Sequence, residues 1–191
     1  MSYLRDRGAR IILCSHLGRP KGRVIDDMRM RPIAERLTQL LDEEVLYSLS
    51  CIGAEVQETV RGLGAGGILL LENLRFHKEE EENDHAFASS LASLADLYVN
   101  DAFGTAHRAQ ASTEGVARYA PLACAGPLLI KELEALSRSL RRPKRPLVAI
   151  VGGSKVSTKL KVLESLSDVV DQLILGGGIL NTFIAAAGYP I

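Results

Sequence analysis

Short apolar runs recur along the chain and are separated by longer segments of mixed polarity. The runs occupy residues 9–14, 68–71, 97–99, 147–151 and 173–175. Each has the length of a β-strand, and each is followed at once by a small, polar or charged residue. The pattern therefore predicts a series of short strands that end abruptly.

Helical spacing of apolar residues fills the segments between these runs. The first pattern begins after Pro32, a residue suited to the first turn of a helix. The members of two such patterns are Ile33, Leu37, Leu40 and Leu41, and Phe87, Leu91, Leu94 and Ala95. Alternating strands and helices require right-handed crossovers, so we expect an α/β fold of parallel sheets with flanking helices, doubly wound and Rossmann-like.

An arginine follows each of the first three apolar runs within a few residues. These are Arg19, Arg75 and Arg108, and the loops of the first and third also carry His16 and His107. Because the carboxyl ends of parallel strands meet at one edge of a sheet, the arginines are expected to converge. Guanidinium groups pair with phosphate or carboxylate through two hydrogen bonds, so the pattern predicts an anion pocket. Taken singly, each arginine fits an ordinary surface position and each histidine a structural one.

Small residues and lysines follow the fourth apolar run. Gly152, Gly153 and Ser154 come first, then Lys155, and Lys159 stands one helical turn further on. A strand that ends in small residues and opens a helix presents free N–H groups and a positive dipole end, which suits phosphate. The Walker pattern Gly-x4-Gly-Lys-Ser/Thr is absent. On its own the segment fits a glycine turn with solvated lysines equally well.

Four longer segments carry a family resemblance when they are read together. They are Ser15-His16-Leu17-Gly18-Arg19-Pro20, Glu72-Asn73-Leu74-Arg75-Phe76, Asn100-Asp101-Ala102-Phe103-Gly104-Thr105-Ala106-His107-Arg108 and Gly152-Gly153-Ser154-Lys155-Val156-Ser157-Thr158-Lys159. In this order and spacing they resemble phosphoglycerate kinase of the bacterial type, over essentially the whole chain. The resemblance implies reversible phosphoryl transfer between 1,3-bisphosphoglycerate and ADP in glycolysis. The products would be 3-phosphoglycerate and ATP, with the nucleotide bound as its Mg²⁺ complex.

The resemblance also implies residue roles. The residues that bind the phosphoglycerate would be His16, Leu17, Gly18, Arg19, Arg75 and Arg108. The residues that bind ATP or ADP would be Gly152, Gly153, Ser154, Lys155, Lys159, Gly176, Gly177 and Gly178. Lys155 would be catalytic, near the transferring group, and no side chain is assigned as a metal ligand. Phosphoryl transfer spreads negative charge over the moving oxygens, so positioning and fixed positive charge are the main requirements.

The expected domain organisation follows from proline punctuation. Pro127 opens a helical pattern that ends before a basic, proline-rich stretch at residues 141–146. We expect a phosphoglycerate-binding domain over 1–126, an interdomain helix and linker over 127–146, and the start of a nucleotide-binding domain over 147–191. An ordinary helix with a basic linker fits residues 127–146 as well.

Some family segments have no counterpart in these 191 residues. They are an early strand with an Arg-x-Asp-x-Asn-x-Pro type segment, a nearby catalytic arginine, and the later nucleotide-binding segments. We therefore expect a fragment in which the first domain is mostly present and the second only begun. The fragment is expected to show no kinase turnover, and a full-length member of the family is expected to be a monomer.

Composition limits the remaining function classes. The 23 basic and 23 acidic residues balance, so no charge bias points to nucleic acid or a membrane surface. No apolar run approaches a membrane span, and residues 1–10 are too charged for a signal peptide, so a cytoplasmic location is expected. The acidic run at 78–84 is expected to be a solvated loop and helix start. The three cysteines form no Cys-x2-Cys pair and indicate neither a disulfide framework nor a zinc site.

Two other functions fit parts of the sequence. Gly176-x-Gly178-x-x-Asn181 after an apolar run is one glycine short of a dinucleotide fingerprint, which would suggest an NAD-dependent oxidoreductase. A non-catalytic truncated product, or a weak anion-binding module that keeps the arginine loops, is the other alternative. Binding of ATP rather than NADH separates the first alternative from the kinase, and turnover separates the second.

Overall fold

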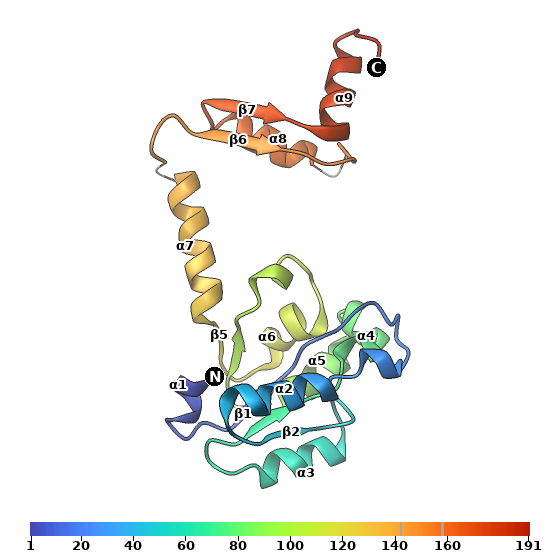
Figure 1. Ribbon diagram of the computed structural model, residues 1–191, viewed down its shortest axis with the longest axis vertical. Helices are drawn as coiled ribbons and strands as arrows, with labels where there is room; N and C mark the ends of the chain where they lie inside the picture. The colour runs from blue at the N-terminus through green and yellow to red at the C-terminus, as the bar shows by residue number, and fades with distance from the viewer. Residues whose placement is uncertain (142, 158) are drawn as a thin grey trace. The chain divides into compact units, whose positions relative to one another are not determined.

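The computed structural model describes residues 1–141, 143–157 and 159–191, and it divides into two compact units, unit 1 (Met1–Ile130) and unit 2 (Lys131–Ile191) (Figure 1). Within the described residues the strands are β1 Ile11–Leu13, β2 Val45–Tyr47, β3 Ile68–Leu70, β4 Tyr98–Asn100, β5 Ala123–Ala125, β6 Val148–Val151 and β7 Gln172–Leu175. The α-helices are α1 Ser2–Arg5, α2 Arg31–Leu41, α3 Ala54–Gly62, α4 Lys78–Glu81, α5 His85–Ala92, α6 Val116–Tyr119, α7 Pro127–Arg141, α8 Leu160–Ser167 and α9 Gly177–Ala186. Shorter helical turns are η1 Asp26–Met28, η2 Leu74–Phe76, η3 Phe103–Thr105 and η4 Ala111–Gly115, the last a π-helix.

The central element of unit 1 is β3, which pairs in parallel with β1 on one side and β2 on the other. Its side chains alternate between two cores, because successive residues of a strand point to opposite faces. Ile68 and Leu70 belong to one buried cluster, and Leu69 and Leu71 belong to the other. The expected α/β fold with parallel, helix-flanked sheets is confirmed.

Helices cover both faces of this sheet. Ala34, Leu37 and Leu41 of α2 pack into the cluster that contains Ile68, whereas Val56 of α3 and Phe87 of α5 pack into the cluster that contains Leu69. Figure 1 shows α2 and α3 on opposite sides of β1, β2 and β3. Helices therefore form at both predicted segments, although α5 ends at Ala92, before the last two residues of its predicted pattern. The predicted apolar stripes reach a core only in part, because Ile33 and Leu40 of α2 are exposed.

The expectation of one shared sheet edge is wrong for the third arginine loop. Within the described residues, β4 pairs with β5 alone, in a separate two-stranded parallel sheet. Alternation of strands and helices predicts strand direction but not which strands become neighbours, because pairing depends on contacts between residues far apart in sequence. Any convergence of Arg108 with the other arginines must therefore come from its loop.

Among the elements of unit 1 that the sequence pattern does not indicate, three help to build its sheets and cores. Strand β2 follows Glu43 and Glu44 directly, α3 carries only a narrow apolar stripe, and β5 consists of Ala123, Cys124 and Ala125. None of the three has the long apolar run or wide stripe that signals an element by itself. Their formation depends on the neighbouring strand or core.

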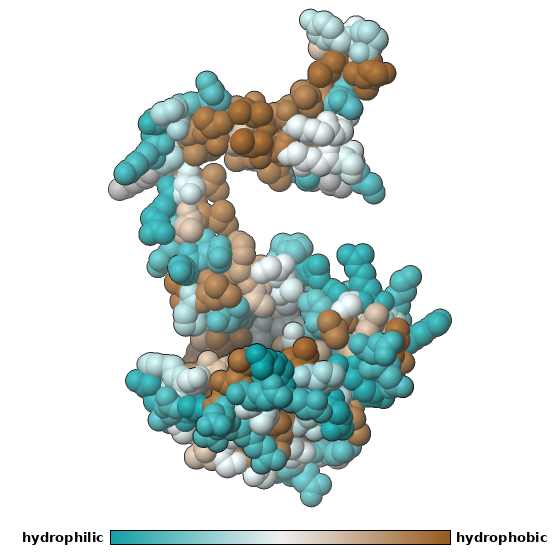
Figure 2. All heavy atoms as spheres, in the orientation of Figure 1, coloured by the Kyte–Doolittle hydropathy of each residue, from teal (hydrophilic) through white to brown (hydrophobic). Residues whose placement is uncertain are grey.

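Unit 2 contains the parallel pair β6–β7, with α8 packed against β7. The two strands alternate in exposure: Val148, Ile150 and Ile174 are exposed, while Ala149 and Leu173 are half-buried. Cross-strand partners share a face, and Ile150 pairs with Ile174, so the exposed side chains form one apolar face. Figure 2 shows hydrophobic side chains gathered over these strands.

Candidate functional site

The loop after β1 and the turn after β3 are joined by hydrogen bonds in unit 1. The Leu74 N–H donates to the Ser15 carbonyl at 3.1 Å, and the Gly22 N–H donates to the Arg75 carbonyl at 3.2 Å. Gly18 has φ +66°, a left-handed conformation that favours glycine, and a Cβ there would lie 2.8 Å from Met28 Sδ. The loop of residues 15–20 thus follows a path that only a glycine at this position permits without strain.

Arg75 lies in η2 with its side chain buried, directly beneath this loop. Its Nη1 donates to the Gly18 carbonyl at 2.9 Å. Its Nε is buried without a hydrogen-bond partner, and the nearest carboxylate oxygen in an ion pair, Glu81 Oε1, is 3.6 Å away. A buried guanidinium N–H without an acceptor is costly, and an anion is the group that would satisfy it.

His16 is half-buried, and the charges of two of the predicted arginines affect its pKa. Burial lowers the pKa of His16, and the positive charges of Arg75 and Arg108 lower it further, while Glu81 acts in the opposite direction. Arg75 is tied to the loop of His16 by its bond to the Gly18 carbonyl, whereas Arg108 lies in the loop after a strand of another sheet and acts on His16 through its charge.

The other predicted residues of unit 1 lie in the same loop as His16 or beside Arg108. Arg19 lies in the same loop as His16 and is exposed, and its side chain makes no hydrogen bond or ion pair in the part of the chain that the structure describes. Leu17 and Gly18 lie between these two residues, with their backbone groups bonded to Asn73 and Arg75. His107 is exposed beside the half-buried Arg108.

Glu80 corrects the prediction that the whole acidic run is solvated. Its side chain is buried and accepts hydrogen bonds from the Ser112 N–H at 2.9 Å and the Ser112 hydroxyl at 2.6 Å. Burial raises the pKa of Glu80, and the Ser112 hydrogen bonds partly offset that rise. The contact ties α4, just after Arg75, to the segment just after Arg108. Four consecutive acidic residues gave no sequence signal for which one turns inward.

We expect the pKa of His16 to lie below its ordinary value of 6.5 in the free protein and to rise when a phosphate-bearing anion neutralises the two guanidinium groups. Because the folded state disfavours the imidazolium, the contribution of His16 to stability is complete above pH 6.5 and decreases as the pH falls toward the folded pKa. NMR titration of the His16 ring measures both effects. Arg108→Gln should raise the pKa, and a value of 6.5 or more in the parent protein would contradict the expectation.

In unit 2 the predicted nucleotide-binding residues meet where β6 and β7 end. The Gly176 N–H donates to the Val151 carbonyl at 2.9 Å, and the Ile179 N–H donates to the Gly153 carbonyl at 3.0 Å. A Cβ on Gly178 would lie 3.2 Å from the Cα of Ser154, so backbone packs directly on backbone. The two glycine segments therefore form one surface at the N-terminus of α9.

The lysines of this surface are arranged differently from the prediction. Helix α8 begins at Leu160, so Lys155 and Lys159 precede it instead of standing one turn apart on it, and Thr158 of the motif lies outside the described residues. Lys159 Nζ donates to the Gly152 carbonyl at 2.7 Å and thus folds back over the loop. Gly176 caps α9 without a side-chain cap, and no acidic residue stands in its first turn, so the positive dipole end is not neutralised by the helix itself.

Of the two neighbouring residues Gly176 and Gly177, only Gly177 has a backbone conformation that requires glycine. Gly177 has φ +63° and a Cβ on it would lie 3.4 Å from the Gly153 carbonyl oxygen, whereas Gly176 has an extended φ of −138° and open space around it. Gly177→Ala should destabilise unit 2 by about 1 to 2 kcal/mol, because alanine is strained in the left-handed region. Hydrogen exchange at β6 and β7 amides measures the loss. Gly176→Ala is the matched control, and equal losses in both variants would refute the explanation.

Metal-binding clusters and membrane-spanning helices are both absent from the described residues. No three of their histidine, cysteine, aspartate or glutamate side chains group in a way that could hold a metal ion. None of their helices is long and apolar enough to cross a bilayer.

Comparison with known proteins adds a family to this geometry. The family model described as "Phosphoglycerate kinase" matches residues 1–191. Phosphoglycerate kinase of Moorella thermoacetica is 58% identical over the whole chain, and "Phosphoglycerate kinase 3, cytosolic" of Arabidopsis thaliana is 56% identical over the whole chain. The chain covers 48% and 47% of these two relatives, so it spans about half the length of the curated relatives it matches.

A solved structure agrees with the sequence matches. The structure of phosphoglycerate kinase from Coxiella burnetii has a TM-score of 0.82 and 50% sequence identity, and the match covers all of this chain and 47% of that one.

Proposed function

Because the chain belongs to the phosphoglycerate kinase family, we propose that the protein transfers a phosphoryl group reversibly between 1,3-bisphosphoglycerate and ADP, giving 3-phosphoglycerate and ATP in glycolysis. The observation that carries the proposal is the buried Nε of Arg75, which lacks a hydrogen-bond partner although Nη1 of the same side chain bonds the loop between His16 and Arg19. The positive charges of Arg75 and Arg108, which lower the pKa of His16, agree with it. These groups suit a small anion with several charges.

Unit 1 supplies the proposed phosphoglycerate site. Arg75 would bind the anion through its buried Nε, and Arg108 would approach from the loop after β4. His16, Leu17, Gly18 and Arg19 would form the facing loop, in which Arg19 is free to turn from solvent toward the ligand. We assign this role to a domain of residues 1–126, with an interdomain helix and linker over 127–146.

Unit 2 supplies part of the proposed ATP or ADP site, in a nucleotide-binding domain that begins at residue 147. Gly152, Gly153 and Ser154 would contact the nucleotide opposite Gly176, Gly177 and Gly178, since the absence of side chains allows close approach to both segments. Lys159 would add positive charge, and Lys155 would contact the transferring group as the catalytic residue. Mg²⁺ would arrive on the nucleotide phosphates, because this surface offers N–H groups and lysines that suit phosphate and not a bare cation.

The residue types fit a mechanism based on positioning. Charge that develops on the moving phosphoryl group is stabilised by fixed guanidinium and ammonium groups and by helix dipoles, so no side chain has to act as a nucleophile. The Mg²⁺ supplied with the nucleotide would neutralise phosphate charge in the same way. We place the protein in the cytoplasm, in line with the Arabidopsis relative named cytosolic, and as a monomer without nucleic-acid or membrane partners.

Titration calorimetry of the 191-residue chain at low salt tests the proposal. We expect binding of 3-phosphoglycerate that weakens as salt is added, and binding of MgATP in preference to NADH. Absence of any 3-phosphoglycerate binding by folded protein would refute the anion site, and a preference for NADH would favour the oxidoreductase alternative. A coupled assay with 3-phosphoglycerate and MgATP then distinguishes an enzyme from a binding module. A binding module would bind 3-phosphoglycerate but show no turnover.

A further inference from the structure

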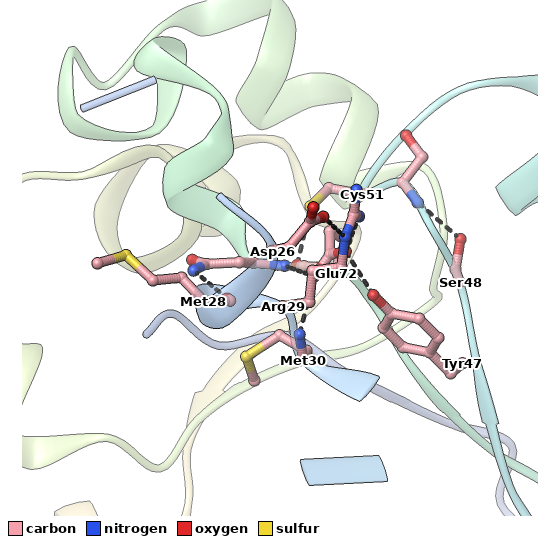
Figure 3. A network of polar contacts seen from close by, with 10 residues as sticks. Asp26, Met28, Arg29, Met30, Tyr47, Ser48, Cys51 and Glu72 are labelled. Atoms are coloured by element: carbon pink, nitrogen blue, oxygen red, sulfur yellow. Dashed lines mark hydrogen bonds and ion pairs between the residues drawn. The ribbon is translucent and has the colours of Figure 1, made fainter. Parts of the chain in front are cut away.

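A buried carboxylate organises the chain beneath the anion site. Glu72, just after β3, is almost fully buried, and its Oε1 accepts hydrogen bonds from the Met30 N–H at 3.0 Å and the Asn73 N–H at 2.8 Å. Its Oε2 accepts a hydrogen bond from Arg29 Nη1 at 2.9 Å and a short one from the Tyr47 hydroxyl. Figure 3 shows Arg29, Met30 and Tyr47 gathered around Glu72. The backbone at Met30 and Asn73 is thus held in place.

Asn73 uses this support to hold the loop above it. Its side chain is fully buried. Its Oδ1 accepts hydrogen bonds from the Leu17 N–H at 3.2 Å and the Arg75 N–H at 3.1 Å, and its Nδ2 donates to the Leu17 carbonyl at 2.8 Å and the Met28 carbonyl at 2.9 Å. The amide therefore pairs with both backbone groups of Leu17, as a neighbouring strand would. With Arg75 it makes a single bond, accepted from the Arg75 N–H.

We propose that Asn73 is a positioning residue of the anion site, whose amide sets the loop that carries His16 and Arg19 at a fixed place relative to Arg75. The proposal rests on the proposed function, because it assumes that these three residues bind the anion. Leu17 stands between His16 and Arg19, so its position limits where both side chains can reach. The bond from Arg75 to the Gly18 carbonyl is the second tie of the loop, and it also depends on Asn73 through the Arg75 N–H.

The amide acts through the loop and not through the ligand. All four of its hydrogen-bonding positions are used within the protein, so none remains to contact an anion. The proposal therefore separates two effects: loss of loop position, which is local, and loss of anion affinity, which follows from it.

Amide hydrogen exchange in the ligand-free chain tests the local effect. In Asn73→Ala, exchange at Leu17 should accelerate by about tenfold or more relative to exchange at Leu71, whose N–H bonds to the Leu13 carbonyl in the sheet. Asn73→Asp keeps the two accepted bonds and loses the two donated ones, so its acceleration should be intermediate. A merely structural role would accelerate exchange at Leu17 and Leu71 alike, and that result would overturn the proposal. If Asn73→Ala does not fold, Asn73→Asp carries the same comparison.

Binding of 3-phosphoglycerate tests the consequence. Asn73→Ala should weaken it by about tenfold, because the loop no longer presents His16 and Arg19 to the anion. The matched control is Asn83→Ala, which removes a different amide hydrogen bond, from Asn83 Nδ2 to Glu114 Oε2 at 2.7 Å, and should leave both Leu17 exchange and affinity within twofold of the parent. Unchanged affinity in Asn73→Ala would overturn the proposal. Failure of the parent itself to bind would refute the proposed function, while the exchange experiment would still report on the loop.

Discussion

Glu72→Ala should lower the free energy of unfolding by about 3 to 5 kcal/mol, the largest single effect expected in this chain. The substitution leaves the buried N–H groups of Met30 and Asn73 without an acceptor and removes one of the two carboxylate partners of Arg29, which keeps Asp26. Each unsatisfied buried group costs its full desolvation penalty of about 1 to 3 kcal/mol, so the two N–H groups account for a loss of this size. Urea denaturation followed by circular dichroism measures the loss.

Two variants make this result specific. Glu82→Ala removes an exposed carboxylate and should change the free energy of unfolding by less than about 0.5 kcal/mol. Glu72→Gln keeps the size and an acceptor oxygen, so its loss should be smaller than that of Glu72→Ala. An unchanged urea midpoint in Glu72→Ala would show that the network in Figure 3 contributes no net stability.

The same network predicts a pH dependence. Burial raises the pKa of Glu72, but the hydrogen bonds from Tyr47, Met30, Asn73 and Arg29 outweigh it, so the pKa lies below the ordinary value of 4.5. The stabilisation is therefore complete above pH 4.5 and is lost as the pH falls through the folded pKa. The acid sensitivity of Glu72→Gln should be correspondingly smaller than that of the parent.

Arg75→Lys should weaken 3-phosphoglycerate binding by about 1 to 3 kcal/mol, although it keeps the positive charge. An ammonium group cannot reproduce the planar fork that bonds the Gly18 carbonyl with Nη1 while presenting Nε to an anion. Arg108→Lys and Arg19→Lys should weaken binding for the same reason, since both lose the bidentate geometry. Titration calorimetry at low salt against the parent chain measures the differences.

Arg138→Lys is the control for this series, because Arg138 is exposed on α7 and has no place in the proposed site. Its affinity should match that of the parent. Equal affinity for the parent and all three site variants would mean that these loops do not form the anion site. The functional assignment would then depend on family membership alone.

Several features were predictable from local pattern. The strands at Val148–Val151 and Gln172–Leu175 and the helix after Pro127 were found because apolar runs, proline and glycine act over a few neighbouring residues. Strand β5 was missed because its short residues carry no such local signal. The proposed site residues were identified in the same way, from arginines and glycines that directly follow strands.

The sequence by itself determined the α/β class, the strand and helix positions with strong periodicity, and the family, because these depend on residue types at fixed spacing along the chain. Only the tertiary structure decided that the strand before Arg108 pairs in a second sheet, that Glu80 turns inward to Ser112, and that Glu72 and Asn73 hold the backbone at Met30 and Leu17. Each of these contacts joins residues that are tens of positions apart, and a buried polar side chain is distinguished from a solvated one only by the partners that folding brings to it.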